Sequence, residues 1–179
     1  AIWNGVQNCY ADLRANVKAK YDVEIEHLKS IGISAMMHGY MAFNDKQEIL
    51  APFRTWRNTN TGAAAAELSK LFNFNIPLRW SISHLYQAIL NKEEHVKDIT
   101  FLTTLAGYIH WQITGEKVLG IGDASGMLPI NSETKNYSKD MIEKFDKLVS
   151  PYGFSWKIED ILPKVLSAGE DAGKLTEAG

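Results

Sequence analysis

The stretch Ile113-Thr-Gly-Glu-Lys-Val-Leu-Gly-Ile-Gly-Asp-Ala-Ser-Gly-Met127 contains the end of one structural element and the start of others. Gly115 follows an apolar, helix-like run, and glycine very commonly ends a helix. Residues 117–121 form a short apolar segment, which predicts a strand or a turn. Asp123 and Ser125 then stand among glycines, a composition typical of turns. The stretch therefore predicts a helix end, a short strand and a glycine-rich loop in succession.

The glycine-rich loop at residues 122–126 superficially resembles a phosphate-binding loop. It lacks the Gly-Lys-Ser/Thr ending of a P-loop, so as a phosphate motif it is weak. Asp123 as the catalytic base of a hydrolase has no local histidine partner, so a catalytic triad is not indicated. From its residues alone the loop is interpreted as ordinary turn chemistry.

Helical patterns occupy much of the chain on both sides of this stretch. Apolar residues near the start of the chain fall on one face at helical spacing. Asn60 or Thr61 suits the N-cap of an alanine-rich helix, and Ser138 suits another. Pro77 suits the opening of the helix that follows it. We expect helices at residues 1–20, 61–71, 78–90, 97–113 and 138–148, and a short helix or turn within residues 158–167.

Strand-like segments are short and lie mostly before residue 60. Residues 30–36 are apolar and partly β-branched, and polar residues flank them, which favours a buried strand. Two apolar runs around the polar residues 44–47 predict a hairpin over residues 40–51. Residues 53–60 predict a strand that runs into a polar loop.

The composition is that of one globular domain and excludes several classes of function. The chain has 179 residues, 45% of them hydrophobic, and a net charge of −2. This charge argues against a broad surface for nucleic acid or anionic membranes, which would need a basic excess. A single cysteine, Cys9, excludes an internal disulfide and fits a cytoplasmic setting. No apolar run has the ~20 residues that span a bilayer, and neither a signal peptide nor an initiator methionine is present.

Met37 and His38 come directly after the expected strand at residues 30–36. Ligands bind at this end of the strands in open α/β sheets, and Gly39 would let the backbone approach a ligand. His38 could then exchange a hydrogen bond with a sugar hydroxyl. The alternative is a loop histidine with a purely structural hydrogen bond.

An aromatic ring, a guanidinium and amides follow one another at Trp56-Arg-Asn-Thr-Asn60. Sugars bind against aromatic faces with polar partners around them, so the combination suits a polyol site. Without other information, Trp56 as a core residue and the rest as a capping loop is the favoured interpretation. The histidines outside this region, His27, His84, His95 and His110, are scattered, and no two have the i, i+4 spacing of a helical zinc pair.

Several segments, in this order, resemble the N-terminal domain of FGGY carbohydrate kinases and, within it, the xylulokinase-like branch. Leu28-Lys-Ser-Ile-Gly-Ile-Ser-Ala-Met-Met-His-Gly39 is similar to the family strand ending in Gly-Gln-Met-His-Gly. Residues 52–60 resemble the segment with Trp-Asn-Asp-Gly-Arg, and residues 113–127 resemble Leu-Thr-Gly-Glu followed by Ser-Asp-Ala-Ser/Ala-Gly-Thr. Ile161-Leu-Pro163 and Gly173-Lys-Leu-Thr176 match two further signals. The resemblance covers residues 1–179.

The resemblance implies an α/β fold, an incomplete ribonuclease-H-like (actin-like ATPase) domain that is rich in helix and has few strands. It implies that residues 1–179 are part of a sugar-binding domain. Met37 and His38 match a Met-His pair that borders the sugar, and Trp56 matches the tryptophan of its motif. Asn58 stands where the family usually has Asp, and Asp123 matches an Asp near the cleft. Asn60 stands where the family has Arg; amides still hydrogen-bond to polyols.

The resemblance also implies a reaction that this chain should not perform alone. The phosphate loop is expected before residue 1, and the catalytic Asp and the nucleotide-binding domain after residue 179. The full-length parent should phosphorylate a sugar or polyol such as the ketopentose xylulose, using ATP and Mg²⁺, neither of which we expect on this fragment. A homo-oligomer is possible. The alternative is a non-catalytic carbohydrate-binding or interaction module on the same scaffold.

Three structural expectations follow. His38, Trp56 and Asn58 should converge on one concavity. The chain should contain more helix than strand. The strand at residues 31–36 should lack its usual neighbours, so that residues 1–179 do not build a complete five-stranded sheet, and its edge should be capped, paired or left open.

Overall fold

The computed structural model describes residues 2–177, and the chain divides into two compact units, residues 1–34 and 35–179. The first unit contains α1 (Ile2–Tyr21), as the apolar spacing predicts, and none of the residues in this helix is buried. Residues 22–34 form no regular element and are almost all exposed.

The strand expected at residues 30–36 is absent, so this prediction is wrong. Ile31 is 59% exposed and Ile33 is 40% exposed, and neither packs into a core. A strand needs a neighbour for its backbone N–H and C=O groups. The apolar, β-branched composition of this segment therefore does not by itself produce a strand.

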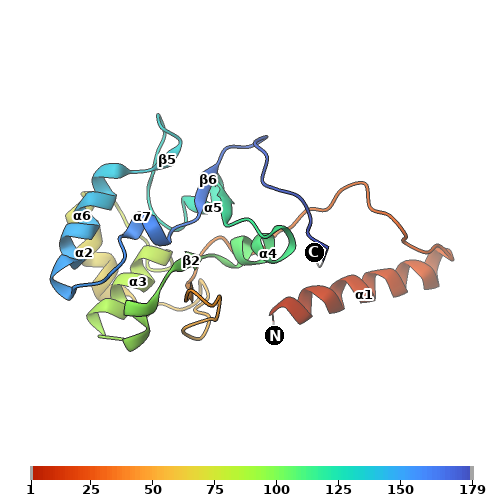
Figure 1. Cartoon of the computed structure of the whole chain (residues 1–179), viewed down its shortest axis with the longest axis horizontal. Helices are drawn as coiled ribbons and strands as arrows, with labels where there is room; N and C mark the ends of the chain where they lie inside the picture. Colours follow the sequence, from red (N-terminus) through yellow and green to blue (C-terminus); the bar gives the residue numbers. More distant parts are fainter. Residues whose placement is uncertain (1, 178–179) are drawn as a thin grey trace. The chain divides into compact units, whose positions relative to one another are not determined.

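The second unit is rich in helix, and its strands are short (Figure 1). Its elements, in chain order, are β1 (Met41–Phe43), α2 (Gly62–Phe72), α3 (Ser81–Leu90), the 3₁₀ helix η1 (Glu94–Asp98), β2 (Phe101–Thr103), α4 (Leu105–Thr114), β3 (Val118–Gly120), α5 (Ile121–Ala124), β4 (Ile130–Asn131), β5 (Asn136–Tyr137), α6 (Lys139–Val149), the 3₁₀ helix η2 (Ser150–Tyr152), α7 (Ile158–Ile161) and β6 (Lys164–Leu166). The expectation of more helix than strand is confirmed.

The described strands form three separate pairs and no five-stranded sheet. β1 and β2 are antiparallel, with Ala42 opposite Leu102. β3 and β6 are parallel, with Leu119 opposite Val165, and β4 and β5 form a small antiparallel pair. Of the strand or turn expected at residues 117–121, the structure has the strand, β3. β6 lies in the segment where a short helix or turn was expected.

The structure contains the turn of the hairpin that was expected at residues 40–51. The amide of Leu50 donates to the carbonyl of Ala42 at 2.8 Å, and an isolated bridge joins Phe43 and Ile49. The expected strand at residues 53–60 is reduced to a bridge at Arg54. The residues after Arg54 form the polar loop that was expected to follow, so only the extent of the strand was wrong.

The helix expected at residues 97–113 is wrong in its first half. Residues 101–103 form β2, and α4 begins only after Thr104, whose hydroxyl accepts a hydrogen bond from the amide of Gly107 at 3.2 Å. This N-cap satisfies an amide that has no partner inside the helix. Backbone pairing with β1 outweighs the helical pattern of the sequence before it.

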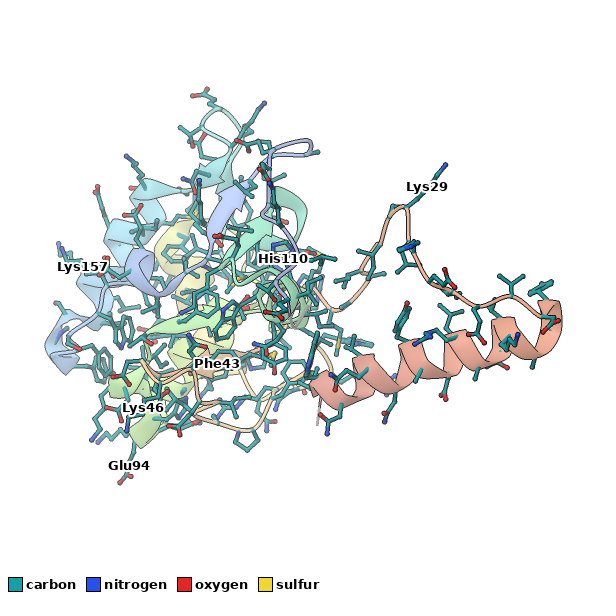
Figure 2. The ribbon with its side chains drawn as sticks, turned by 45° about the vertical axis from the view of Figure 1, so that its right-hand side comes forward. Lys29, Phe43, Lys46, Glu94, His110 and Lys157 are labelled. Carbon is teal, nitrogen blue, oxygen red and sulfur yellow. The ribbon has the colours of Figure 1, made fainter. Side chains whose placement is uncertain are left out.

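The core lies where α2, α3 and α6 pack together (Figure 1). Leu68, Leu85 and Phe145 are fully buried, one from each of these helices. Phe43 is also buried, whereas Lys46 and Lys157 are exposed and extend outward (Figure 2). In the described part of the chain, no helix combines the length and apolar character that crossing a membrane requires.

Candidate functional site

The segment with Met37 and His38 enters the core through Gly39. The φ angle of Gly39 is 115°, and a Cβ atom here would lie 2.5 Å from the carbonyl oxygen of Arg54. Only glycine fits this close approach without strain. Directly after it, Tyr40 and Arg54 form an antiparallel bridge in which the amide of Tyr40 donates to Arg54 at 2.9 Å.

This bridge sets the geometry of two predicted sugar-binding segments. Partners in an antiparallel pair run in opposite directions, so the residues before Tyr40 and those after Arg54 leave the bridge at the same end. His38 therefore lies two residues from the bridge on one strand, and Trp56 two residues from it on the other. The bridge therefore places both predicted sugar-binding segments at the same end, as a common site requires.

Residues 55–60 form a compact polar loop. The amide of Asn58 donates to the carbonyl of Thr55 at 2.9 Å, and the side-chain oxygen of Asn58 accepts from the amide of Asn60 at 3.1 Å. Trp56 is 47% exposed, so it is not a core residue, and the guanidinium of Arg57 lies 5.2 Å from its ring centroid. The structure thus presents an aromatic ring and amides at the surface.

His38 lies against the glycine-rich loop. A Cβ atom on Gly126 would be 2.4 Å from Nδ1 of His38 and 2.7 Å from the carbonyl oxygen of Met37. Nδ1 is buried and has no partner among the described residues. Burial and the charge of Arg79 lower the pKa of His38, and Gly126 and Asp123 offset this only in part. The imidazole is therefore neutral at pH 7.

Asp123 lies near His38, in the four-residue helix α5 rather than in the turn expected from the sequence. Burial raises the pKa of its carboxyl group above the ordinary value, and the neighbouring His38 opposes the shift. The structure therefore brings Met37, His38 and Asp123 together. The convergence of Trp56 and Asn58 on these three residues stays a prediction.

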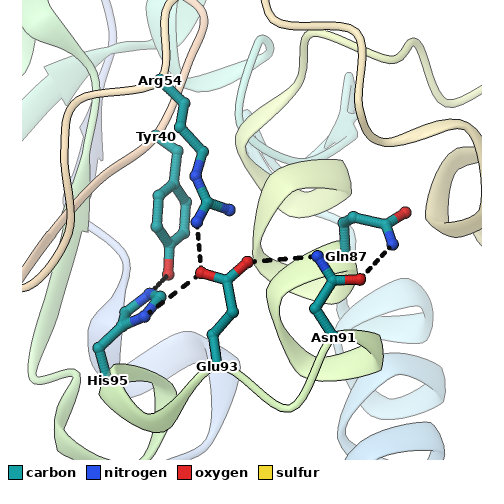
Figure 3. A network of polar contacts seen from close by, with 6 residues as sticks. All are labelled: Tyr40, Arg54, Gln87, Asn91, Glu93 and His95. Atoms are coloured by element: carbon teal, nitrogen blue, oxygen red, sulfur yellow. Dashed lines mark hydrogen bonds and ion pairs between the residues drawn. The ribbon is translucent and has the colours of Figure 1, made fainter.

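A polar network beneath the bridge was not foreseen from the sequence (Figure 3). Arg54 forms an ion pair with Glu93, and Glu93 also receives a hydrogen bond from Asn91 and faces His95. Oppositely charged residues 39 positions apart give no local signal of pairing. His95, which looked like one of several scattered histidines, bonds through Nε2 to the hydroxyl of Tyr40 at 2.7 Å.

Residues 1–179 match the profile of the FGGY family of carbohydrate kinases, N-terminal domain. The chain belongs to this family. It is 20% identical over 159 residues to the xylulose kinase of Staphylococcus xylosus, covering 84% of this chain and 31% of the relative.

Solved structures of FGGY kinases share the fold. A "xyloylose kinase" from Brucella ovis gives a TM-score of 0.73 at 19% identity, over 91% of this chain and 34% of that one. Gluconate kinase from Lactobacillus acidophilus gives 0.70 at 16% identity, over 90% and 32%. Xylulose kinase from Bifidobacterium adolescentis gives 0.64 at 15% identity, over 93% and 45%. The fold is therefore the helix-rich, actin-like ATPase type that the sequence predicted.

The FGGY chain spans about a third of the length of the curated relative and of the first structures it matches. Within residues 2–177, no group of three His, Cys, Asp or Glu side chains could hold a metal ion. In the glycine-rich loop, the Ser125 hydroxyl donates to the carbonyl of Gly122 at 2.6 Å and is engaged within the loop. Neither observation indicates a site for Mg²⁺ or for the ATP phosphates in the described part of the chain.

A surface hollow of about 350 Å³ also occurs on this FGGY domain, beside the β4–β5 pair and the start of α6. None of the predicted sugar-binding residues lines it. Its lining residues are Phe74, Pro129, Ile130, Asn131, Ser132, Glu133, Ser138 and Met141. We attach no sugar-binding role to this hollow.

Proposed function

We propose that the protein containing this chain transfers the γ-phosphoryl group of ATP to a hydroxyl of a sugar or polyol, and that this chain supplies part of the sugar-binding surface. The observation that carries the proposal is the match of residues 1–179 to the N-terminal domain of FGGY carbohydrate kinases. ATP and Mg²⁺ would be held, and the accepting hydroxyl activated, by parts of the protein outside these residues. The reaction would take place in the cytoplasm.

The proposed sugar contacts come from three segments. Neutral His38 can exchange a hydrogen bond with a sugar hydroxyl beside Met37 through Nε2, because its Nδ1 is buried against Gly126. The exposed ring of Trp56 offers a face for the C–H groups of a sugar, and the amide of Asn58 can donate or accept. Asp123 supports this arrangement as an acceptor close to His38.

The proposed substrate is a ketopentose such as xylulose. Support comes from the curated relative and two of the similar structures, whose names describe kinases of this sugar. The second candidate, a non-catalytic carbohydrate-binding module on the same scaffold, predicts sugar binding without phosphoryl transfer. Amides at Asn58 and Asn60 suit both candidates because they hydrogen-bond to polyols without contributing charge.

The deciding experiment is a screen of the full-length protein for ADP release across sugars and polyols, xylulose and gluconate included. We expect release that depends on the sugar and on Mg²⁺, and we expect His38→Ala to raise the sugar KM more than the ATP KM. Sugar binding without sugar-dependent ADP release would instead favour the binding module. If the protein neither binds nor phosphorylates any sugar of the panel, both candidates fail.

A further inference from the structure

The loop at residues 55–60 is fixed at its start by Arg54. The guanidinium of Arg54 pairs with Oε2 of Glu93, and the two side chains are only 21% and 25% exposed. The same guanidinium lies 5.2 Å from the centroid of the Tyr40 ring. The residue that precedes the loop is thus held from two directions.

The first turn of α2, which follows the loop, is connected to the same carboxylate. The amide of Ala64, in the first turn of α2, donates to the side-chain oxygen of Gln87 at 3.3 Å. The Gln87 amide donates to Asn91 at 3.0 Å, and Asn91 donates to Oε1 of Glu93 at 3.4 Å (Figure 3). One oxygen of Glu93 therefore connects to Arg54, just before the loop, and the other to Ala64, in the helix that follows it.

Glu93 also reaches the segment that carries His38. Its Oε2 faces Nδ1 of His95 at 3.5 Å, and Nε2 of His95 bonds to the hydroxyl of Tyr40 at 2.7 Å. Burial lowers the pKa of His95, and Arg54 adds to this although Glu93 opposes it, so the imidazole is neutral at pH 7. The tautomer of neutral His95 that is consistent with these two contacts carries its proton on Nδ1. The hydroxyl of Tyr40 then donates to Nε2, and the N–H of Nδ1 points toward Glu93.

We infer that Glu93 is the positioning residue that holds the two predicted sugar-binding segments, residues 37–39 and 55–60, in register with each other. It acts through Arg54, His95 and Asn91. Removing its charge leaves the partly buried guanidinium of Arg54 without its counter-ion, which is costly and frees the start of the loop. A sugar contact at this loop depends on the function proposed above. The ordering of the loop by Glu93 does not depend on that function.

The chain offers a matched pair of variants to test this role. Glu93→Gln removes the charge at the centre of the network. Glu94→Gln makes the same change one residue later, at an exposed side chain that extends outward and takes no part in the network of Figure 3 (Figures 2 and 3). Hydrogen–deuterium exchange of the backbone at residues 55–61 reports the order of the loop, and exchange within α3 reports the core.

We expect Glu93→Gln to speed exchange at residues 55–61 at least tenfold while α3 stays protected, and Glu94→Gln to match the wild type. Unchanged exchange at residues 55–61 in a folded Glu93→Gln variant would overturn the role. If that variant does not fold, Arg54→Lys serves instead, because it keeps the charge and loses the planar fork of guanidinium donors. The same result is then expected for this variant, and its absence has the same meaning.

Affinity for xylulose, measured by calorimetry on the 179-residue chain, separates this inference from the proposed function. If the wild type binds, Glu93→Gln should weaken binding about tenfold, with partial rescue by Glu93→Asp; equal binding would overturn the role in recognition. If the wild type binds none of the sugars tested, the sugar-binding role proposed for this chain fails, and the exchange data alone decide whether Glu93 orders the loop.

Discussion

His84 illustrates how much a single buried side chain can contribute to the pH dependence of stability. It is fully buried in α3, and neither ring nitrogen has a partner among the described residues. Burial, together with the charge of Arg54, lowers its pKa to about 4 from an ordinary 6.5. Its ring centroid lies 6.3 Å from that of Tyr40, next to the polar network.

The first prediction concerns this histidine. Between pH 6.5 and about 4 the unfolded chain binds a proton at His84 and the folded chain does not, so stability falls as the pH falls. The loss is about 3 kcal/mol. His84→Leu should therefore flatten the acid side of the stability curve in urea unfolding at several pH values. His27→Gln, at an exposed position, is the control, and an unchanged slope in His84→Leu would contradict the prediction.

Gly126 provides the second prediction at this scale. Alanine here would bring a Cβ atom within 2.4 Å of His38 and 2.7 Å of the Met37 carbonyl. Gly126→Ala should cost about 1–3 kcal/mol of stability and displace His38. Gly122 lies in the same loop with nothing within 4 Å of an added Cβ, so Gly122→Ala should be nearly neutral. Thermal unfolding of the two variants checks this, and equal midpoints would contradict it.

Elements differ in how much of them is encoded locally. The helices α2, α3 and α6 were predicted from local signals, the alanine-rich run of α2 and the flanking residues Thr61, Pro77 and Ser138. β2 and β6 could not be found in this way, because each has only three residues and pairs with a distant strand. Conversely, the apolar segment at residues 30–36 looked like a strand but pairs with no strand among the described residues.

The candidate site likewise contains some residues that the sequence indicated and others that it did not. The motifs indicated Met37, His38 and Asp123, and contacts of the folded chain bring these three together. The role of Glu93 depends on pairing with Arg54 across 39 positions, which no local pattern contains. The sequence therefore shows which residue types a loop contains. It does not show which distant residues fix the position of that loop.

The third prediction compares two helix caps. The hydroxyl of Thr104 caps α4, whereas Ser138 precedes α6 without a side-chain capping bond. Thr104→Ala should cost about 1 kcal/mol or more, because an amide at the start of α4 loses its partner. Ser138→Ala should cost less. Urea unfolding of the two variants checks the difference, and a larger loss for Ser138→Ala would contradict the cap assignment.

At the scale of the whole molecule, the described residues contain no group of three His, Cys, Asp or Glu side chains suited to a metal ion. Phosphoryl transfer depends on metal ions and phosphate-binding groups to stabilise the developing charge, and the proposed function places these groups outside residues 1–179. The chain also spans about a third of its curated relative. Binding and chemistry should therefore be separable in this protein.

The fourth prediction follows from this separation. The purified 179-residue chain should release no ADP from ATP in response to xylulose, whereas the full-length protein should. A coupled assay on both proteins, with the chain purified until contaminating kinase activity is absent, makes the comparison. Sugar-dependent ADP release by the chain alone would contradict the prediction.

The pairing of β1 with β2 has a consequence for the order in which the chain folds. Met41 meets Thr103 only after α2, α3 and η1 have been accommodated between them. Closing a loop of this length costs about 3–4 kcal/mol of chain entropy before the pairing contributes anything. A nascent chain that has not yet extended beyond residue 103 cannot pair β1 in this way, so shortened versions ending before that point would leave Met41 and Phe43 without their partner strand.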